Sequence, residues 1–236
     1  MPQPFGSVQE RLGLRTPPIA IGFLEVEPQG LPRWNDGSVP AGCSFWEKAM
    51  AGGTFYTLPS DHFNCAVGCH THRLSLPPDR RAELTDAAQM MVGAGYLLPA
   101  DVLSMPTLSK TPAAIAYAPV DGAPFHVDVV LLATTAAQGM LVYETLLRLG
   151  SGPTMTVNAL GRPACGLLPF VTEGGRAALS FGCKGNRTFT GLPDDQLFFG
   201  VPGPAWGRFV ELLATIVDAN ETMGRYYAGR RAPTDI

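Results

Sequence analysis

The sequence predicts an α/β or α+β fold: a mixed sheet with helices packed on it, in a single compact domain over residues 1–236. Segments of strand composition alternate with helical segments in both halves of the 236-residue chain. The run Val129-Val130-Leu131-Leu132 is continuously apolar, which is typical of a strand covered on both faces. The 27 glycines and 22 prolines are spread along the chain, which predicts turns between short elements. They are not concentrated in a segment that would indicate a linker between domains.

The first half of the chain contains two strand-like and two helical segments. Residues 18–24 form a compact apolar run that predicts a buried strand. Residues 41–51 predict a short helix that two glycines end, and 54–58 have strand composition. Residues 79–92 predict a strong helix, because two prolines and a capping Asp79 precede it and glycine follows it.

The second half alternates in the same way. Its predicted strands are 113–118, 127–133, 176–181 and 197–201. Its predicted helices are 134–149, which ends at a glycine, and 204–227, which has Pro204 in its first turn. We expect the core of the single domain to cover about residues 10–225.

Composition restricts the class of protein. Apolar residues make up 46% of the chain and charged residues 16%, with a net charge of −3, so we expect no nucleic-acid partner. No apolar run has the roughly 18–20 residues that span a bilayer, and the N-terminus lacks signal-peptide features, so we expect a cytoplasmic protein without a membrane partner. The expected partner is a small molecule or a redox protein, and a homo-oligomer is compatible with the sequence.

Residues 61–72 hold two of the five cysteines and three of the four histidines. Thiolate and imidazole are strong ligands for soft and borderline metals. The spacing Cys65-x3-Cys69-His70 nevertheless differs from haem attachment and from redox C-x-x-C motifs, which have two residues between the cysteines. The local motif therefore does not define a metal site by itself.

The other cysteines, Cys43, Cys165 and Cys183, each lie near Gly or Pro at the predicted junction of two elements. Exposed backbone N–H groups at such junctions stabilise sulfur anions. The alternative is that each is a small buried apolar residue.

The order of these pieces resembles a bacterial and archaeal family, domain of unknown function 169, also called uncharacterised ArCR. The matching pieces are residues 18–23, Cys43 with Trp46, Ala49 and Gly52, Cys65 with Gly68, residues 127–132, Cys165, residues 180–187 and residues 200–202. The resemblance covers about residues 10–225 and implies a dispersed set of four cysteines, at 43, 65, 165 and 183. Cys69, His70 and His72 depart from the family pattern, and the family name records no activity.

Four thiolates from separate loops are what a [4Fe–4S] cluster or a structural zinc requires. We therefore expect a metal- or iron–sulfur-binding protein with a redox or metal-handling role, with or without enzymatic activity, and with zinc as the second choice. Cys43, Cys65, Cys165 and Cys183 would be the ligands, and Cys69 the catalytic thiol or a spare ligand. His70 and His72 would line the entry for a substrate.

Two alternatives stay open. In the first, the same loops enclose a small anion or metabolite that Arg187 anchors with its planar guanidinium. In the second, the protein is a thiol-redox protein that uses Cys65 and Cys69. Neither a G-x-S-x-G motif nor a dinucleotide or phosphate-loop motif occurs, so these enzyme classes are not expected.

Overall fold

The computed structural model describes residues 7–150, 158–160 and 163–230, and in them seven strands form one mixed sheet. The strands are β1 (Ile19–Leu24), β2 (Phe55–Thr57), β3 (Ala114–Pro119), β4 (Val129–Thr135), β5 (Asn158–Leu160), β6 (Ala178–Ser180) and β7 (Gln196–Pro202). Their order is β2-β3-β1-β4-β7-β6-β5, and the β5–β6 pair is parallel while the others are antiparallel. The predicted mixed sheet in a compact domain is confirmed.

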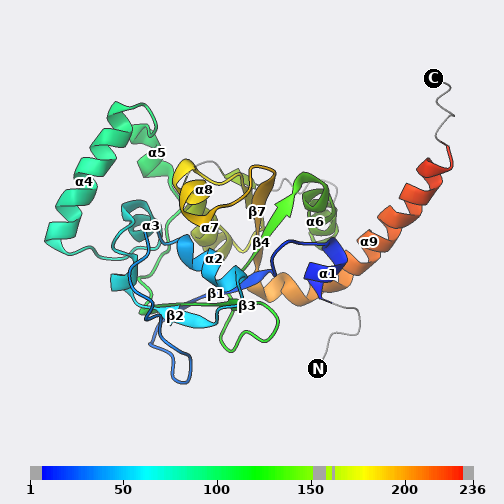
Figure 1. Ribbon diagram of the computed structural model, residues 1–236, viewed down its shortest axis with the longest axis horizontal. Helices are drawn as coiled ribbons and strands as arrows, with labels where there is room; N and C mark the ends of the chain where they lie inside the picture. The colour runs from blue at the N-terminus through cyan, green and yellow to red at the C-terminus, as the bar shows by residue number, and fades with distance from the viewer. Residues whose placement is uncertain (1–6, 151–157, 161–162, 231–236) are drawn as a thin grey trace.

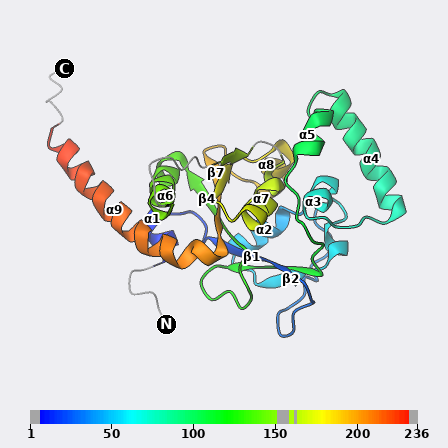
Figure 2. The same cartoon turned by 180° about the vertical axis from the view of Figure 1, so that it is seen from behind.

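Helices cover both faces of this sheet (Figures 1 and 2). The α-helices are α1 (Val8–Leu12), α2 (Ser44–Met50), α3 (Ala66–Thr71), α4 (Pro78–Gly93), α5 (Pro99–Ser104), α6 (Ala136–Leu149), α7 (Leu167–Gly174), α8 (Lys184–Thr190) and α9 (Trp206–Ala228). Short 3-10 turns are η1 (Pro59–His62), η2 (Ala164–Gly166) and η3 (Gly203–Ala205). Helix α6 begins directly after β4 because Thr135 and Gln138 form a capping box there.

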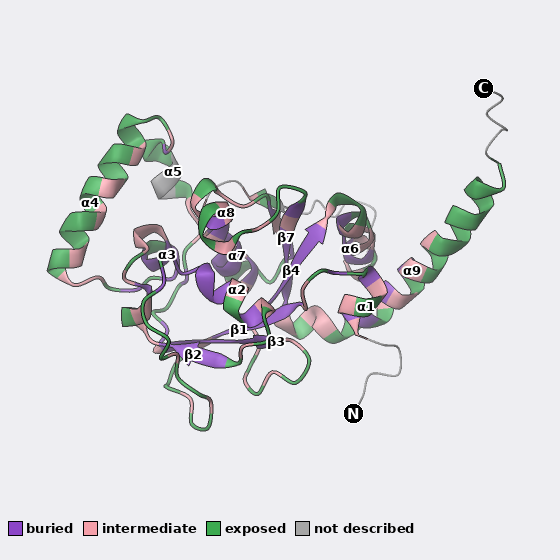
Figure 3. Ribbon diagram, in the orientation of Figure 1, coloured by how far each residue is buried: buried purple, intermediate pink, exposed green. Residues whose placement is uncertain are grey.

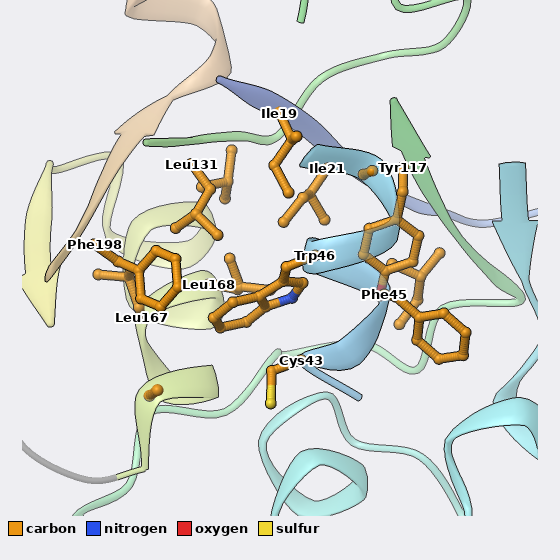
Figure 4. Close-up of a cluster of buried hydrophobic side chains, with 14 of the residues drawn as sticks. Ile19, Ile21, Cys43, Phe45, Trp46, Tyr117, Leu131, Leu167, Leu168 and Phe198 are labelled. Atoms are coloured by element: carbon orange, nitrogen blue, oxygen red, sulfur yellow. The ribbon is translucent and has the colours of Figure 1, made fainter. Parts of the chain in front are cut away.

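The central strand β4 separates two hydrophobic cores. Val129 and Leu131 face one core, in which Trp46 of α2 packs edge-on against Phe198 of β7 (Figure 4). The alternate residues, Val130 and Leu132, face the second core, which α6 and α9 complete. All four side chains of the run are fully buried, which confirms the prediction of a strand covered on both faces.

Two helices extend from the body at opposite ends of the molecule. Helix α4 lies at the end that carries α3 and α5, and the last part of α9 projects from the other end (Figure 1). No residue of α4 is fully buried, and Figure 3 shows none of it in the buried colour. Among the described residues, no helix is both long and apolar enough to cross a membrane.

Several short elements differ from the sequence-based prediction. Helices α7 and α8 follow Cys165 and Cys183 at two of the expected junctions, but no bounds were predicted for them. Strand β5 lies where no element was predicted, and β6 covers three residues where six were expected. Helix α8 contains Gly185 and two threonines, which are poor helix formers, so its sequence carries little helical signal. The limits predicted for the domain, 1–236, include ends that lie outside the described residues.

Candidate functional site

Four cysteines from distant parts of the chain line one pocket. Cys43, Cys65 and Cys183 are the N-cap residues of α2, α3 and α8, and Cys165 lies in the turn η2 that leads into α7. All four belong to the lining of a cavity of about 270 Å³. The dispersed cysteines therefore converge, although their separation in sequence is as large as 140 residues between 43 and 183.

Two of these thiols cap the helices that they precede. The backbone N–H of Gly68 donates to Cys65 Sγ at 3.3 Å, and the N–H of Asn186 donates to Cys183 Sγ at 3.4 Å. These are the hydrogen bonds that Ser or Thr makes at an N-cap. A Cβ at position 68 would lie 3.2 Å from Cys65 Sγ, so Gly68 leaves room for the sulfur.

The first helix turn of α2 places Cys43 at the edge of the hydrophobic core, below Trp46 (Figure 4). Burial raises the pKa of the Cys43 thiol to about 12, although the neighbouring Asn186 side chain opposes the shift. Burial also raises the pKa of Cys165 well above its usual value, and the nearby thiol of Cys65 acts in the same direction. Cys43 and Cys165 are therefore neutral thiols at pH 7.

Helix α4 and the segment after it cover the pocket. Leu84, Ala87 and Met91 are half-buried and line the cavity, and their spacing places them on one face of α4. Arg80 extends the same face and holds α4 down, because its guanidinium donates to the Phe63 carbonyl at 3.0 Å and to the Asn64 side-chain oxygen at 2.6 Å.

Beyond α4, the hydroxyl of Tyr96 accepts a hydrogen bond from the Lys184 N–H at 3.0 Å. Since Lys184 begins α8, this bond ties the segment after α4 to the helix that Cys183 caps. Sequence reasoning missed this cover. The apolar residues of α4 at i, i+3 and i+7 were the signal that could have shown it.

The described residues that line the pocket include no Asp, Glu, Lys or Arg. The lining histidine, His72, is fully buried, and burial lowers its pKa to about 4, so it is neutral at pH 7. Asn186 is equally buried. Neither the ring nitrogens of His72 nor the amide atoms of Asn186 make a hydrogen bond of normal geometry with the described residues.

A second buried histidine lies behind the pocket. The rings of His62 and His72 are 6.2 Å apart, and His62 Nε2 lies 2.8 Å from the hydroxyl oxygen of Thr57. Burial lowers the pKa of His62 to about 3, and His72 adds to the effect. Two neutral imidazoles thus form the polar interior beneath an otherwise apolar pocket.

The convergent cysteines do not form a metal site. In residues 7–150, 158–160 and 163–230, no group of three or more His, Cys, Asp or Glu side chains is arranged to hold a metal ion. The prediction of a metal- or iron–sulfur-binding function, with Cys43, Cys65, Cys165 and Cys183 as ligands, is therefore wrong. The physical reason is that these thiols, although they line one cavity, are not arranged as a set of ligands around one ion.

The remaining residues singled out in the sequence lie outside the pocket lining, except His72. Cys69 is buried, its thiol donates to the His62 carbonyl at 3.3 Å, and burial raises its pKa to about 12. His70 is exposed. The Arg187 guanidinium donates to three backbone carbonyls, those of Phe181, Pro193 and Gln196. Arg187 thus closes the loop around α8.

The fold and the site define an α/β protein whose cysteines line an uncharged pocket beneath a surface helix. The chain belongs to the family named domain of unknown function 169, described as uncharacterised ArCR, whose family model matches residues 7–211. This match confirms the resemblance found in the sequence. Comparisons with curated proteins and with solved structures found no match.

Proposed function

We propose that the protein binds a small, neutral and largely apolar organic molecule in the cysteine-lined pocket. The observation that carries the proposal is the chemistry of the lining: thiols, alanines, leucines and methionines surround a cavity of about 270 Å³, and the described lining residues include no Asp, Glu, Lys or Arg. This volume is close to the lower end of ligand sites, at about 300–1,000 Å³.

The lining disfavours an anion. A carboxylate or phosphate moved from water into such a pocket would lose its hydration without gaining a cation, which costs several kcal/mol or more. The nearest predicted anchor, Arg187, already donates its guanidinium hydrogens to backbone carbonyls. A neutral molecule has no such penalty and gains from the removal of apolar surface from water.

The pocket also offers two polar partners. His72 and Asn186 are buried in the lining, and neither makes a hydrogen bond of normal geometry with the described residues, although the Asn186 side chain lies close enough to Cys43 to oppose the rise of its pKa. Buried polar groups are normally paired, so an unpaired one in a cavity indicates a place for a ligand's polar atom. Neutral imidazole and a carboxamide can each donate and accept, which suits a hydroxyl, carbonyl or amide group.

The experiment is a comparison of two tryptophan variants of α4. Ala87→Trp places an indole at a lining position and fills the cavity, whereas Ala82→Trp places it at an exposed position of the same helix. Binding is measured by ligand-observed NMR with matched pairs of compounds, benzamide against benzoate and benzyl alcohol against phenylacetate. We expect the neutral members to bind the wild type and Ala82→Trp, and to lose binding in Ala87→Trp.

Two results would contradict the proposal. One is preferential binding of the carboxylates, or binding that Ala87→Trp leaves unchanged. The other is stoichiometric iron or zinc in anaerobically purified protein that disappears in Cys43→Ser, because the pocket would then hold a metal centre. Native mass spectrometry of the same preparation supplies an independent readout, since a co-purified neutral molecule adds its mass to the folded chain.

A further inference from the structure

The four thiols of the pocket differ in their surroundings, and this difference separates them into chemical roles. Cys65, Cys165 and Cys183 are partly exposed to the cavity, whereas Cys43 is buried at 9% exposure. Cys69 lies outside the lining with its thiol bonded to a carbonyl. A reaction of thiols in the pocket is therefore expected at Cys65, Cys165 or Cys183. The buried Cys43 and Cys69 should react more slowly.

Among the three, Cys65 and Cys165 lie on elements that pack directly against each other. Cys65 caps α3, Cys165 lies in η2, and α3 and η2 are in contact. Of the thiols that act electrostatically on Cys165, Cys65 has the largest effect and Cys183 the smallest. Disulfide formation requires Cα atoms within about 7 Å, a separation that the contact between α3 and η2 allows.

We infer that Cys65 and Cys165 form a redox-active dithiol, which closes reversibly to a disulfide in the wall of the pocket when a small disulfide such as oxidised glutathione reacts with it. This chemistry replaces the pair Cys65 and Cys69 expected from the sequence, since the Cys69 thiol is bonded to the His62 carbonyl. It involves the same pocket as the proposed ligand but does not depend on that ligand.

The structure assigns an order to the two steps. Burial raises the pKa of Cys165 well above its usual value and disfavours its thiolate, so Cys65 reacts first. The Cys65 thiolate attacks one sulfur of oxidised glutathione, which forms a mixed disulfide and releases one glutathione. The Cys165 thiolate then attacks the Cys65 sulfur, the Cys65–Cys165 bond forms, and the second glutathione leaves. The protein loses two electrons and two protons, and oxidised glutathione is reduced to two thiols.

The second step can proceed although the pKa of Cys165 is raised. The attacking and accepting sulfurs belong to one folded chain, so the reaction is intramolecular and has a high effective concentration.

The test uses the full chain in glutathione redox buffer, with Cys65→Ser, Cys165→Ser and the matched control Cys183→Ser. Free thiols are blocked with N-ethylmaleimide, and intact mass and peptide mapping identify the bonds. We expect wild type and Cys183→Ser to contain a peptide linked through Cys65 and Cys165. Cys165→Ser should retain one glutathione on Cys65, and Cys65→Ser should contain neither the link nor a glutathione on Cys165.

The inference is overturned if the main disulfide joins another pair, or if glutathione accumulates on Cys65 of the wild type without closure. It is also overturned if Cys165→Ser and Cys65→Ser behave alike. Circular dichroism and thermal unfolding establish that each variant is folded before its thiols are mapped. Because the readout is a covalent bond, its failure is distinguishable from a failure of neutral ligands to bind.

Discussion

Proline at position 85 should detach α4 from the pocket without unfolding the protein. Thr85 is exposed in the middle of α4, and its hydroxyl donates to the Arg81 carbonyl. Thr85→Pro removes a backbone N–H donor and clashes with the preceding turn, at a cost of about 3 kcal/mol. Thr85→Ala is the matched control, because it keeps the backbone N–H and removes only the side-chain bond.

The structure indicates how much free energy opposes this detachment. The two large apolar side chains that α4 presents to the pocket, Leu84 and Met91, are half-buried. Full burial of such a side chain stabilises by about 1.5–3 kcal/mol, so together the two half-buried side chains contribute about 1.5–3 kcal/mol. The cost of the proline is at least as large, so a substantial fraction of α4 should be undocked in Thr85→Pro while both cores stay intact.

Hydrogen exchange measured by mass spectrometry tests this reasoning. A local change of about 3 kcal/mol raises exchange in the 78–93 peptide by about 100-fold, and β4 should stay much better protected than this peptide. The free energy of urea unfolding should fall by no more than the docking free energy of α4, because the packing of both cores is unchanged. Protection of the 78–93 peptide as strong as that of β4 in the wild type would refute the reasoning, since α4 would then belong to the cooperative core.

Three further predictions concern buried groups and backbone contacts. Burial lowers the pKa of His72 to about 4 and of His62 to about 3, so the unfolded chain binds more protons below about pH 6.5. The free energy of unfolding should therefore fall as the pH drops from 6.5 to 4, and His72 should account for on the order of 3 kcal/mol of this fall. Chemical denaturation of His72→Gln over the same pH range should show a smaller fall than that of the wild type. Gly203→Ala should lower the thermal midpoint because its Cβ would lie 1.8 Å from a backbone carbonyl oxygen, whereas Gly207→Ala, with open space at its Cβ, should raise stability by about 0.5–1 kcal/mol. Arg187→Lys should cost about 1–3 kcal/mol in urea unfolding, because Lys cannot replace a guanidinium that donates to three carbonyls, and it should leave the binding of benzamide unchanged.

The sequence was most informative where a pattern reports burial directly. The apolar run of β4 indicated a strand covered on both faces, and the structure places its residues alternately in two cores. Helix 79–92 was also predicted correctly from its prolines and the glycine after it, although Pro77 and not the expected Asp79 is its N-cap residue. The bounds of α7 and α8 were not predicted, because one contains Pro169 and the other weak helix formers, and both are held by tertiary packing.

The pocket contains all four of the dispersed cysteines that the sequence grouped together. The metal function inferred from them was wrong because ligand type can be read from a sequence, whereas the spacing of sulfur atoms around a centre depends on the fold. Asn186 and the cover formed by α4 were missed for the same reason, since their relation to the cysteines exists only in three dimensions.

The chemistry of cysteine explains why this residue type occurs at the helix starts around the pocket. At Cys65 and Cys183 a side chain must accept a backbone N–H, a role that Ser, Thr, Asp or Asn commonly fills. Those residues would bring a strongly polar group to the wall of the cavity. A thiol is a weak acceptor and otherwise behaves as a small apolar group, so it completes the helix turn and keeps the wall apolar. Both cysteines are also partly exposed, as the thiol exchange inferred above requires of Cys65. The same two side chains therefore complete helix turns and line a pocket whose described lining has no charged residue type.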